Sequence, residues 1–306
     1  MTTNQPLIES EVAAASPAGG ELTHTARPLR VAAETLVENK AALLGVIVIL
    51  LMLGFSFIGP LFYHTNQIST NLPASFHPPS AAHPLGTDND GFDVLGRLML
   101  AGQSSLEVGL AAAAIATVVG VIYGAVSGFA GGILDGVMMR LVDGLLAIPT
   151  IFLLVFLFTV YQASTPLLVL VIGLVAWLVP ARLVRAETLS LRTREYVQAV
   201  RVIGGNNRRI LIRHIIPNTV GTIMVNATFQ VADAILALAS LGFLGLGVQP
   251  PATNWGAMLS TGINYVYAGY WWLIWPPGIA IVLIVMAFNA VGDGLRDVFE
   301  VRLQRR

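Results

Sequence analysis

The chain has 306 residues, of which 55% are hydrophobic and only 11% are charged, and its mean hydropathy is +0.74. Average soluble domains carry roughly 25% charged residues. This composition therefore excludes an ordinary soluble protein and indicates an integral membrane protein. The formal net charge is zero, and no cysteine is present, which excludes a disulfide framework and a thiolate metal site.

The N-terminal 36 residues predict a disordered cytoplasmic tail, because residues 1–36 are rich in Ala, Thr, Ser and Glu. They lack an apolar core, so a secretory signal peptide is not expected. Residues 41–62 form the first apolar run long enough to cross a membrane, and we place the first transmembrane helix within residues 37–64. The extracytoplasmic segment that follows, residues 65–103, is long enough to form a small ordered cap.

Further apolar runs predict a five-helix core within residues 104–293. The expected helices cover residues 106–128, 137–161, 167–183, 219–246 and 271–291, and the turn signal QASTP at 162–166 divides two of them. Gly120, Gly124 and Gly128 repeat every fourth residue, which predicts close helix packing. The predicted fold is an all-α integral membrane protein with six transmembrane helices, and residues 294–306 are expected to form a cytoplasmic tail.

Basic residues predict the orientation, since Lys and Arg are retained on the cytoplasmic side during insertion. With both termini inside, sixteen of the seventeen basic residues are cytoplasmic, including the eight arginines between Arg182 and Arg213. Only Arg97 falls outside. We therefore predict an N-in, C-in topology, which places the polar loop at residues 185–218 in the cytoplasm.

The polar loop contains EYVQAVRVIGGNNRRILIRHIIPN, which predicts two short helices around a Gly-Gly turn. Gly204 and Gly205 are expected to end the first helix, since glycine adopts the left-handed conformation of a helix C-cap. Asn206 fits the N-cap of the second helix, and Pro217 is expected to interrupt that helix before the next span. On these residues alone, the loop is either a docking surface for a soluble partner or a plain cytoplasmic linker. The first helix is expected to carry one apolar stripe, formed by Tyr196, Val197, Val200 and Ile203.

The loop resembles the EAA motif of ABC importer permeases, and more closely the form found in dipeptide and oligopeptide permeases. Gln198, Ala199 and Val200 occupy the EAA positions and Gly204 the glycine, so the chain departs from the motif at its first and third positions. Three further segments are similar to the C-type subunit of that family. They are HPLGTDNDGFDVLGRLMLAGQSSLEVG at 83–109, with Phe92 where Arg is usual, DAILALASLGFLGLGVQPPATNWGAML at 233–259, and FNAVGDGLRD at 288–297.

The resemblance implies a type I ABC importer permease fold and a role as a transmembrane permease subunit of an ATP-driven peptide importer, in a bacterial or archaeal plasma membrane. The implied partners are a sister permease of the B type, one or two ATP-binding subunits, an extracytoplasmic substrate-binding protein and the lipid bilayer, without nucleic acid. The loop would be the coupling helix that sits in a cleft of the ATP-binding subunit. The expected coupling residues are Glu195, Gln198, Ala199, Val200, Arg201, Gly204, Gly205, Arg208 and Pro217.

ATP hydrolysis is not expected in this chain. A P-loop requires Gly-x-x-x-x-Gly-Lys-Ser/Thr, and the only lysine is Lys40, which no such glycines precede. We therefore expect a subunit that is no enzyme by itself and holds no cofactor, with ATP and magnesium bound by the partner subunit. The inferred mechanism is a population shift, in which closure of the ATPase dimer moves the loop and tilts the helix bundles between inward- and outward-facing states.

Asn226, Gln230 and Asp233 fall at i, i+4 and i+7 and share one face of the fifth span. Ionisable groups inside a membrane are costly and usually face a water-filled path or a partner. These residues are therefore candidates to line the translocation pathway. The alternative is that Asp233 hydrogen-bonds within the bundle or at a subunit interface.

Asp88, Asp90 and Asp93 are expected at the extracytoplasmic mouth. A calcium loop is excluded, because the EF-hand register puts Gly86 first and Arg97 twelfth. The spacing of the histidines in this segment follows no common metal pattern, so no metal site is expected.

Other functional classes remain as alternatives. An autonomous secondary transporter would also account for Asp233, although it would not need the cytoplasmic loop. A membrane-embedded enzyme would need convergent catalytic groups, and the spans offer no such constellation. Within the family that the chain resembles, a permease for another small solute, such as nickel or glutathione, is the alternative to a peptide permease.

Overall fold

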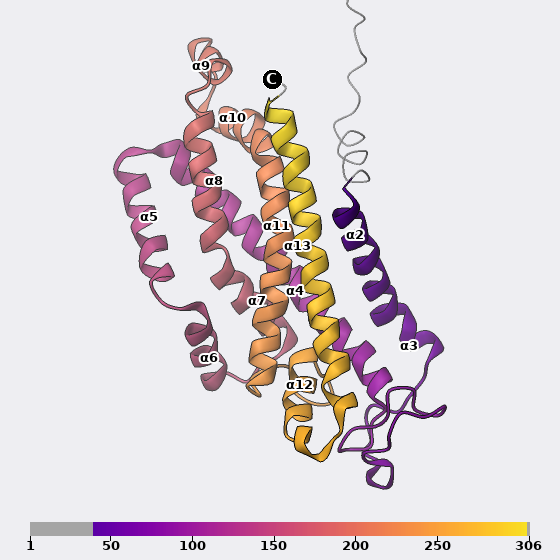
Figure 1. The fold of residues 1–306 in the computed structure, drawn as a ribbon. Helices are drawn as coiled ribbons and strands as arrows, with labels where there is room; N and C mark the ends of the chain where they lie inside the picture. The colour runs from indigo at the N-terminus through magenta and orange to yellow at the C-terminus, as the bar shows by residue number, and fades with distance from the viewer. Residues whose placement is uncertain (1–38, 305–306) are drawn as a thin grey trace, which may run out of the picture.

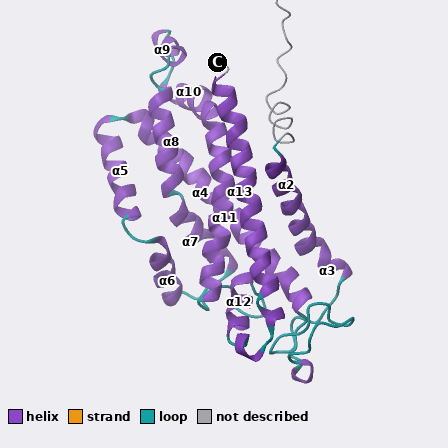
Figure 2. Ribbon diagram, viewed as in Figure 1, coloured by secondary structure: helices purple, strands orange, loops and turns teal. Residues whose placement is uncertain are grey.

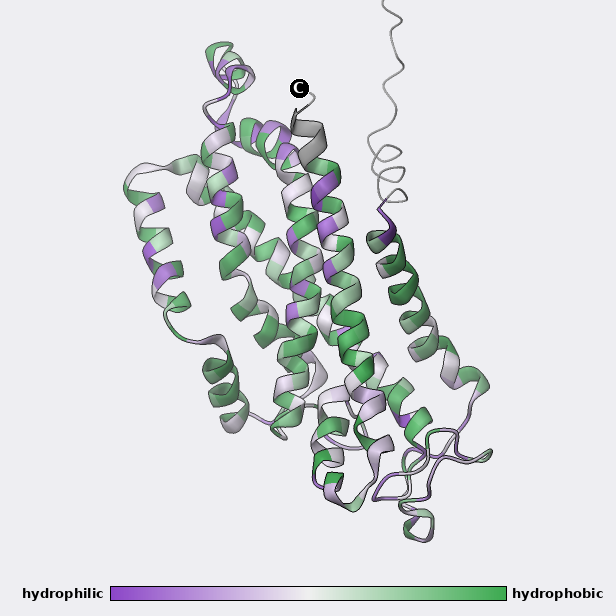
Figure 3. Cartoon of the chain, viewed as in Figure 1, coloured by the Kyte–Doolittle hydropathy of each residue, from purple (hydrophilic) through white to green (hydrophobic). Residues whose placement is uncertain are grey.

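The computed structural model describes residues 39–304 as a bundle of helices (Figure 1), so the predicted tail at residues 1–36 lies outside the described residues. Within the described residues the chain consists of helices and loops without a strand (Figure 2), apart from an isolated bridge between Thr87 and Asp93. Hydrophobic residues cover most of the length of the long helices (Figure 3). The predicted all-α membrane fold is confirmed, since helices satisfy every backbone group internally in lipid.

The first span is one helical run, Lys40–Phe62, interrupted by a π-helical turn. It comprises α2 (Lys40–Leu53), the π turn η1 (Gly54–Ile58) and α3 (Gly59–Phe62). The Asn39 side chain caps its start by accepting hydrogen bonds from the backbone N–H groups of Ala41 and Ala42. The π turn ends two residues before Pro60. Since proline has no N–H and collides with the carbonyl four residues back, a π turn accommodates it without ending the helix.

The second span, α4 (Val94–Ala130), begins well before the expected residue 106. Asp93 caps it, since its carboxylate accepts a hydrogen bond from the backbone N–H of Gly96 at 2.8 Å. The expected outer segment at 65–103 is therefore shorter, because residues 94–103 belong to α4. The polar residues of that first part of the helix concealed its start from an analysis based on hydropathy.

The third and fourth predicted spans are bent pairs of helices. The third consists of α5 (Gly132–Leu146) and α6 (Thr150–Val160), bent by 75°, and the fourth of α7 (Thr165–Ala176) and α8 (Leu178–Leu191), bent by 40°. Pro149 lies at the first break and Pro180 shortly after the second. The described residues hold four helices that are long and apolar enough to cross a membrane, or up to six candidate spans if each bent pair counts as one.

The polar loop and the fifth span form a short helix and one long helical run. The first element is α9 (Glu195–Val202), and the run Asn207–Phe243 contains α10 (Asn207–Ile210), the π turn η3 (Leu211–Ile215) and α11 (Ile216–Phe243). The predicted interruption at Pro217 is wrong. The π turn ends two residues before this proline, as it does before Pro60, and the helix continues through it.

The last part of the chain contains α12 (Trp255–Ile263), two 3-10 turns, η4 (Val266–Ala268) and η5 (Trp271–Leu273), and α13 (Trp275–Gln304). A further 3-10 turn, η2 (Leu72–Ala74), lies in the loop before α4. α13 extends beyond the expected residue 291, so most of the predicted tail at 294–306 continues the last helix.

The central helix α4 packs closely against α8 through the predicted glycine stripe. A Cβ atom at Gly120 would lie 2.6 Å from Cβ of Pro180, and one at Gly124 would lie 2.3 Å from the carbonyl oxygen of Ala181. Such distances leave no room for a side chain. The predicted structural role of the glycines is therefore confirmed for the contact between α4 and α8.

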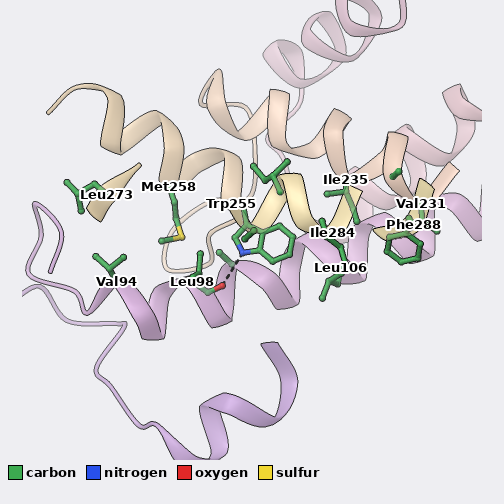
Figure 4. Packing of buried hydrophobic residues seen from close by; sticks show 14 of the residues in the cluster. Val94, Leu98, Leu106, Val231, Ile235, Trp255, Met258, Leu273, Ile284 and Phe288 are labelled. Atoms are coloured by element: carbon green, nitrogen blue, oxygen red, sulfur yellow. Dashed lines mark hydrogen bonds between the residues drawn. The ribbon is translucent and has the colours of Figure 1, made fainter. Parts of the chain in front are cut away.

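The main core lies where α4, α11, α12 and α13 meet (Figure 4). Trp255 is fully buried there, and its indole N–H donates a hydrogen bond to the carbonyl oxygen of Leu98 at 3.1 Å. At the end of the bundle opposite α12 lie α9, the start of α2 and the end of α13 (Figure 1), and Asn39 donates from its amide to the Asp297 carboxylate at 3.1 Å. The two ends of the described chain thus lie on one side of the bundle, opposite α12.

Candidate functional site

A helical elbow, residues 195–218, lies at one end of the bundle, and its first helix α9 projects from that end (Figure 1). Its corner is a Schellman-type C-cap of α9. The N–H of Gly205 donates to the carbonyl of Val200 at 2.9 Å, and the N–H of Gly204 donates to the carbonyl of Arg201 at 3.1 Å. Gly204 has φ +83°, the left-handed conformation that favours glycine.

Gly205 has a different reason to be glycine. A Cβ atom there would lie 2.5 Å from Cγ1 of Val200 and 2.7 Å from its carbonyl oxygen. After the corner, the Asn206 side chain accepts a hydrogen bond from the N–H of Arg208 at 3.2 Å and caps α10 as predicted. The local sequence therefore determines the turn between the two arms of the elbow.

The elbow is anchored to the bundle by a small hydrophobic cluster. Val197, Ile210 and Ile215 are fully buried and pack with Phe129 at the end of α4 and Leu191 at the end of α8. Side chains from both arms take part, so the elbow is held at a fixed angle to the bundle.

The predicted apolar stripe of α9 is divided between two faces. Val197 and Val200 face the cluster, whereas Tyr196 is 41% exposed and Ile203 is 83% exposed. Ile203 is the C-cap residue, at the end of α9 next to the corner of the elbow. Val202 is 86% exposed, so the adjacent side chains of Val202 and Ile203 form an exposed apolar tip at the end of α9.

Gln198, at the first EAA position, links α9 to the end of α8 by a hydrogen bond. Its amide nitrogen donates to the carbonyl oxygen of Arg192 at 3.0 Å, a bond that a carboxylate at this position could not donate. Arg192 in turn donates from Nη1 to the carbonyl oxygens of Gly128 and Phe129, at 3.0 and 3.4 Å. A cation at the C-terminal end of α4 is favoured by the helix dipole.

A buried ion pair joins α5 to α8, the helix that leads into the elbow. Arg185 of α8 contacts both carboxylate oxygens of Asp135 in α5 at 2.6 Å, and the Ser127 hydroxyl of α4 donates to the same carboxylate at 2.6 Å. Asp135 is buried, so the bidentate geometry compensates its loss of hydration. Sequence analysis missed Asp135, Arg185 and Arg192, because only the fold brings them together.

The remaining predicted coupling residues lie on the surface of the elbow. Glu195, Ala199, Arg201, Arg208 and Pro217 are exposed. They are therefore accessible to a partner, which is the condition that the predicted coupling role requires.

The three predicted pathway residues lie in different surroundings. Asp233 is exposed on α11, and Asn226 is half-buried with its side-chain oxygen enclosed. Gln230 is only 5% exposed and donates to the carbonyl oxygen of Ala176 at 2.7 Å. In this structure Gln230 therefore contacts the break between α7 and α8.

At the end of the bundle opposite the elbow, residues 63–93 form an ordered cap, in which Asp93 is a structural residue. Besides capping α4, its carboxylate accepts a hydrogen bond from the hydroxyl of Tyr63 at 2.9 Å and lies 2.9 Å from Nδ1 of His83. Burial and the hydrogen bond to the carboxylate raise the pKa of Tyr63 to about 12.

Asp88 also serves the structure of the cap. Its Oδ1 accepts hydrogen bonds from the backbone N–H groups of Asp90 and Phe92, both at 2.9 Å, and burial raises the pKa of its carboxyl group. Arg97 lies 3.5 Å from its other oxygen and 4.5 Å from the ring centroid of Phe92. Phe92 thus packs against Arg97. It is Phe92 that stands where arginine is usual in the family that the chain resembles.

A cavity of about 310 Å³ opens between the cap, the start of α4 and the segment that joins α11 to α12. Asp88, Asp90 and Arg97 line it on one side and Gln249 and Thr253 on the other. Asp93 does not line it. Among the described residues, no group of three or more His, Asp or Glu side chains is arranged to hold a metal ion.

The fold and these two surfaces define a class of protein. The chain is a polytopic helical membrane protein with an anchored helical elbow at one end and a capped cavity at the other. Residues 95–305 match the family described as binding-protein-dependent transport system inner membrane component, and residues 27–79 match the N-terminal transmembrane domain of oligopeptide transport permease C. The chain belongs to the family of binding-protein-dependent transport system inner membrane components.

Curated relatives agree with this assignment over nearly the whole chain. The chain is 37% identical to the oligopeptide transport system permease protein OppC of Bacillus subtilis, over 88% of each chain. It is 41% identical to the OppC protein of Salmonella typhimurium, over 86% of this chain and 88% of the relative. It is 36% identical to the dipeptide transport system permease protein DppC of Bacillus subtilis, over 88% of this chain and 84% of the relative.

Proposed function

We propose that this chain is a transmembrane permease subunit of an ATP-driven importer for peptides, of the dipeptide and oligopeptide class. The anchored elbow with its exposed apolar tip carries the proposal, because it is a rigid surface of a kind that transmits force between the bundle and a soluble protein. Membership in the family and the printed names of the relatives support the substrate class.

The proposed topology has six spans with both termini in the cytoplasm. Each bent pair of helices then counts as one span, and the elbow, the end of α13 and the start of α2 share the cytoplasmic side. The charge distribution supports this orientation, since of the seventeen basic residues Arg97 alone then lies at the extracytoplasmic end, in contact with Asp88.

The proposed assembly contains a B-type sister permease, one or two ATP-binding subunits that bind ATP and magnesium, and an extracytoplasmic substrate-binding protein, in a bacterial or archaeal plasma membrane. The elbow contacts an ATP-binding subunit, and the cap and its cavity face the substrate-binding protein. Asn226 and Asp233 remain proposed pathway residues, since Asp233 is exposed on α11 in the single subunit. Nucleotide binding closes the ATPase dimer, moves the elbows and shifts the population between inward- and outward-facing states.

Reconstitution tests the proposal. The chain is co-expressed with its sister permease and ATP-binding subunits, purified as a complex and placed in proteoliposomes, and uptake of a labelled peptide is measured with and without ATP and the substrate-binding protein. We expect uptake only when both are present. Peptide uptake by this chain alone would identify a secondary transporter, and a binding protein that selects nickel or glutathione would assign another substrate.

A further inference from the structure

Two helices of this protein contain a proline whose missing hydrogen bond is replaced by a glutamine side chain from another helix. In an α-helix the carbonyl of each residue accepts the N–H of the residue four positions later, and proline has no N–H to donate. Pro180 therefore leaves the carbonyl of Ala176 without its helical donor, and Pro60 does the same to Ser56. Gln230 donates to the first carbonyl at 2.7 Å and Gln103 to the second at 2.9 Å.

The Gln230 bond lies at the bend of the fourth span. The carbonyl of Ala176 is at the end of α7, Trp177 separates α7 from α8, and the two helices are bent by 40°. Gln230 is 5% exposed, so water does not compete for the bond. On the other side Pro180 is held by α4, where the absence of a side chain at Gly120 allows close contact.

The bond joins α11, which leads out of the elbow, to the end of α7, two residues before α8 begins. α8 leads into the elbow and α11 leads out of it, so any displacement of the elbow acts on both. The bend between α7 and α8 is the point at which α8 could turn separately, and Gln230 ties that point to α11.

We propose that Gln230 is a positioning residue for transport: its bond to the freed carbonyl of Ala176 holds the proline bend against α11, so that the start of α8 keeps its position beside α11 when the elbow moves. Without the bond, the bend moves away from α11 and part of the movement of the elbow is lost there. The proposal rests on the proposed function, because it assumes that a soluble ATPase moves the elbow.

Gln103 provides a matched control within the same chain. Its amide makes the same kind of bond to a carbonyl freed by proline, but it joins α4 to the first span, which does not flank the elbow. If such bonds serve only to satisfy a carbonyl, loss of either has similar consequences. If Gln230 couples the two helices, only its loss affects coupling.

The experiment compares Gln230→Met with Gln103→Met in the complete reconstituted complex. Methionine keeps the approximate volume and removes the donor. We expect Gln230→Met to lower the number of peptides transported per ATP hydrolysed by about fivefold to tenfold, which is the effect of losing one buried hydrogen bond, whereas Gln103→Met retains the parent ratio.

Label distances give a second readout that a merely structural role would not change. Because the chain has no cysteine, single pairs can be introduced on α8 and α11 for spin labelling. In the parent complex we expect the distance between the labels to stay constant between nucleotide-free and ATP-bound states. In Gln230→Met it should change with nucleotide and show a broader distribution.

The outcomes separate this proposal from the proposed function. If the parent complex transports no peptide, the proposed function fails; if the parent transports and Gln230→Met matches it in transport ratio and label distances, the coupling role is refuted. An equal loss in both methionine variants also refutes it. Should Gln230→Met fail to assemble, Gln230→Asn, which withdraws the amide by one methylene, is measured by the same criteria.

Discussion

The corner of the elbow allows a sharp test, because Gly204 needs glycine for conformation alone. Its φ is +83°, and a Cβ atom there would meet nothing within 4 Å. A residue with a side chain therefore pays no steric cost against neighbours but must adopt the left-handed region, at about 1–2 kcal/mol. This corresponds to a roughly fivefold to thirtyfold smaller population of the native corner, if the corner opens independently of the bundle.

We expect the effect to follow the tolerance of each residue for positive φ. Gly204→Val should be the most impaired, because a β-branched side chain is poorly tolerated there, Gly204→Ala intermediate, and Gly204→Asn close to the parent. The control is Gly136→Ala in α5, where a Cβ atom also meets nothing within 4 Å and no positive φ occurs. Its helix propensity improves, so no loss is expected.

The assay is peptide-dependent ATP hydrolysis and transport by the reconstituted complex, together with co-purification of the ATP-binding subunit. Insertion and yield should be unchanged in every variant, because Val197, Ile210 and Ile215 still anchor the elbow. Full coupling in Gly204→Val would refute the argument that the Schellman corner sets the geometry of the contact. Equal losses in the Val and Asn variants would also refute it, since they would point to a steric cause.

Three further substitutions test the packing that supports the elbow and the cap. Asp135→Asn removes the carboxylate that Arg185 contacts, and we expect the free energy of unfolding to fall by about 3 kcal/mol, measured in detergent by tryptophan fluorescence. Gly124→Val would place a side chain 2.3 Å from the carbonyl oxygen of Ala181, and size-exclusion chromatography should show little monodisperse protein. The raised pKa of Tyr63, about 12 against 10.0 for a free phenol, means that the folded state holds this proton more tightly than the unfolded state does. Its stabilising contribution is therefore complete below pH 10 and is lost as the pH rises toward 12, and Tyr63→Phe should remove that part of the pH dependence of unfolding.

Each of these expectations has a result that contradicts it. An unchanged free energy of unfolding in Asp135→Asn would mean that the contact between Asp135 and Arg185 contributes no net stability. Normal yield of Gly124→Val would mean that α4 and α8 separate easily. Identical pH dependence of unfolding in Tyr63→Phe and the parent would mean that the phenol does not stabilise the cap.

Sequence patterns predicted the elbow well, because its determinants are local. Gly204 and Gly205 form the predicted C-cap and Asn206 the predicted N-cap, and each depends on neighbours within a few residues. The prediction failed at Pro217, where an interruption was expected. A π turn absorbs the proline there, and hydropathy and turn signals do not distinguish that outcome from a break.

The polar residues of the spans were the least predictable part of the site. Their spacing places Asn226, Gln230 and Asp233 on one face, but it does not show which neighbour each one meets. A missing N–H at Pro180 was a signal in the sequence that some donor must reach Ala176. Only the packing of α11 against α7 shows that Gln230 is that donor.

The sequence by itself determined the class of this protein: an apolar helical chain with segregated basic residues, a glycine-cornered elbow and no P-loop. These properties follow from composition and short-range chemistry. The tertiary structure decided which buried polar groups meet, as in the bond from Gln230 to Ala176 and the contact between Asp135 and Arg185, 50 residues apart in the chain. Such pairs depend on how helices cross, and helix crossing is set by the close approach of small residues from distant segments, which no local pattern specifies.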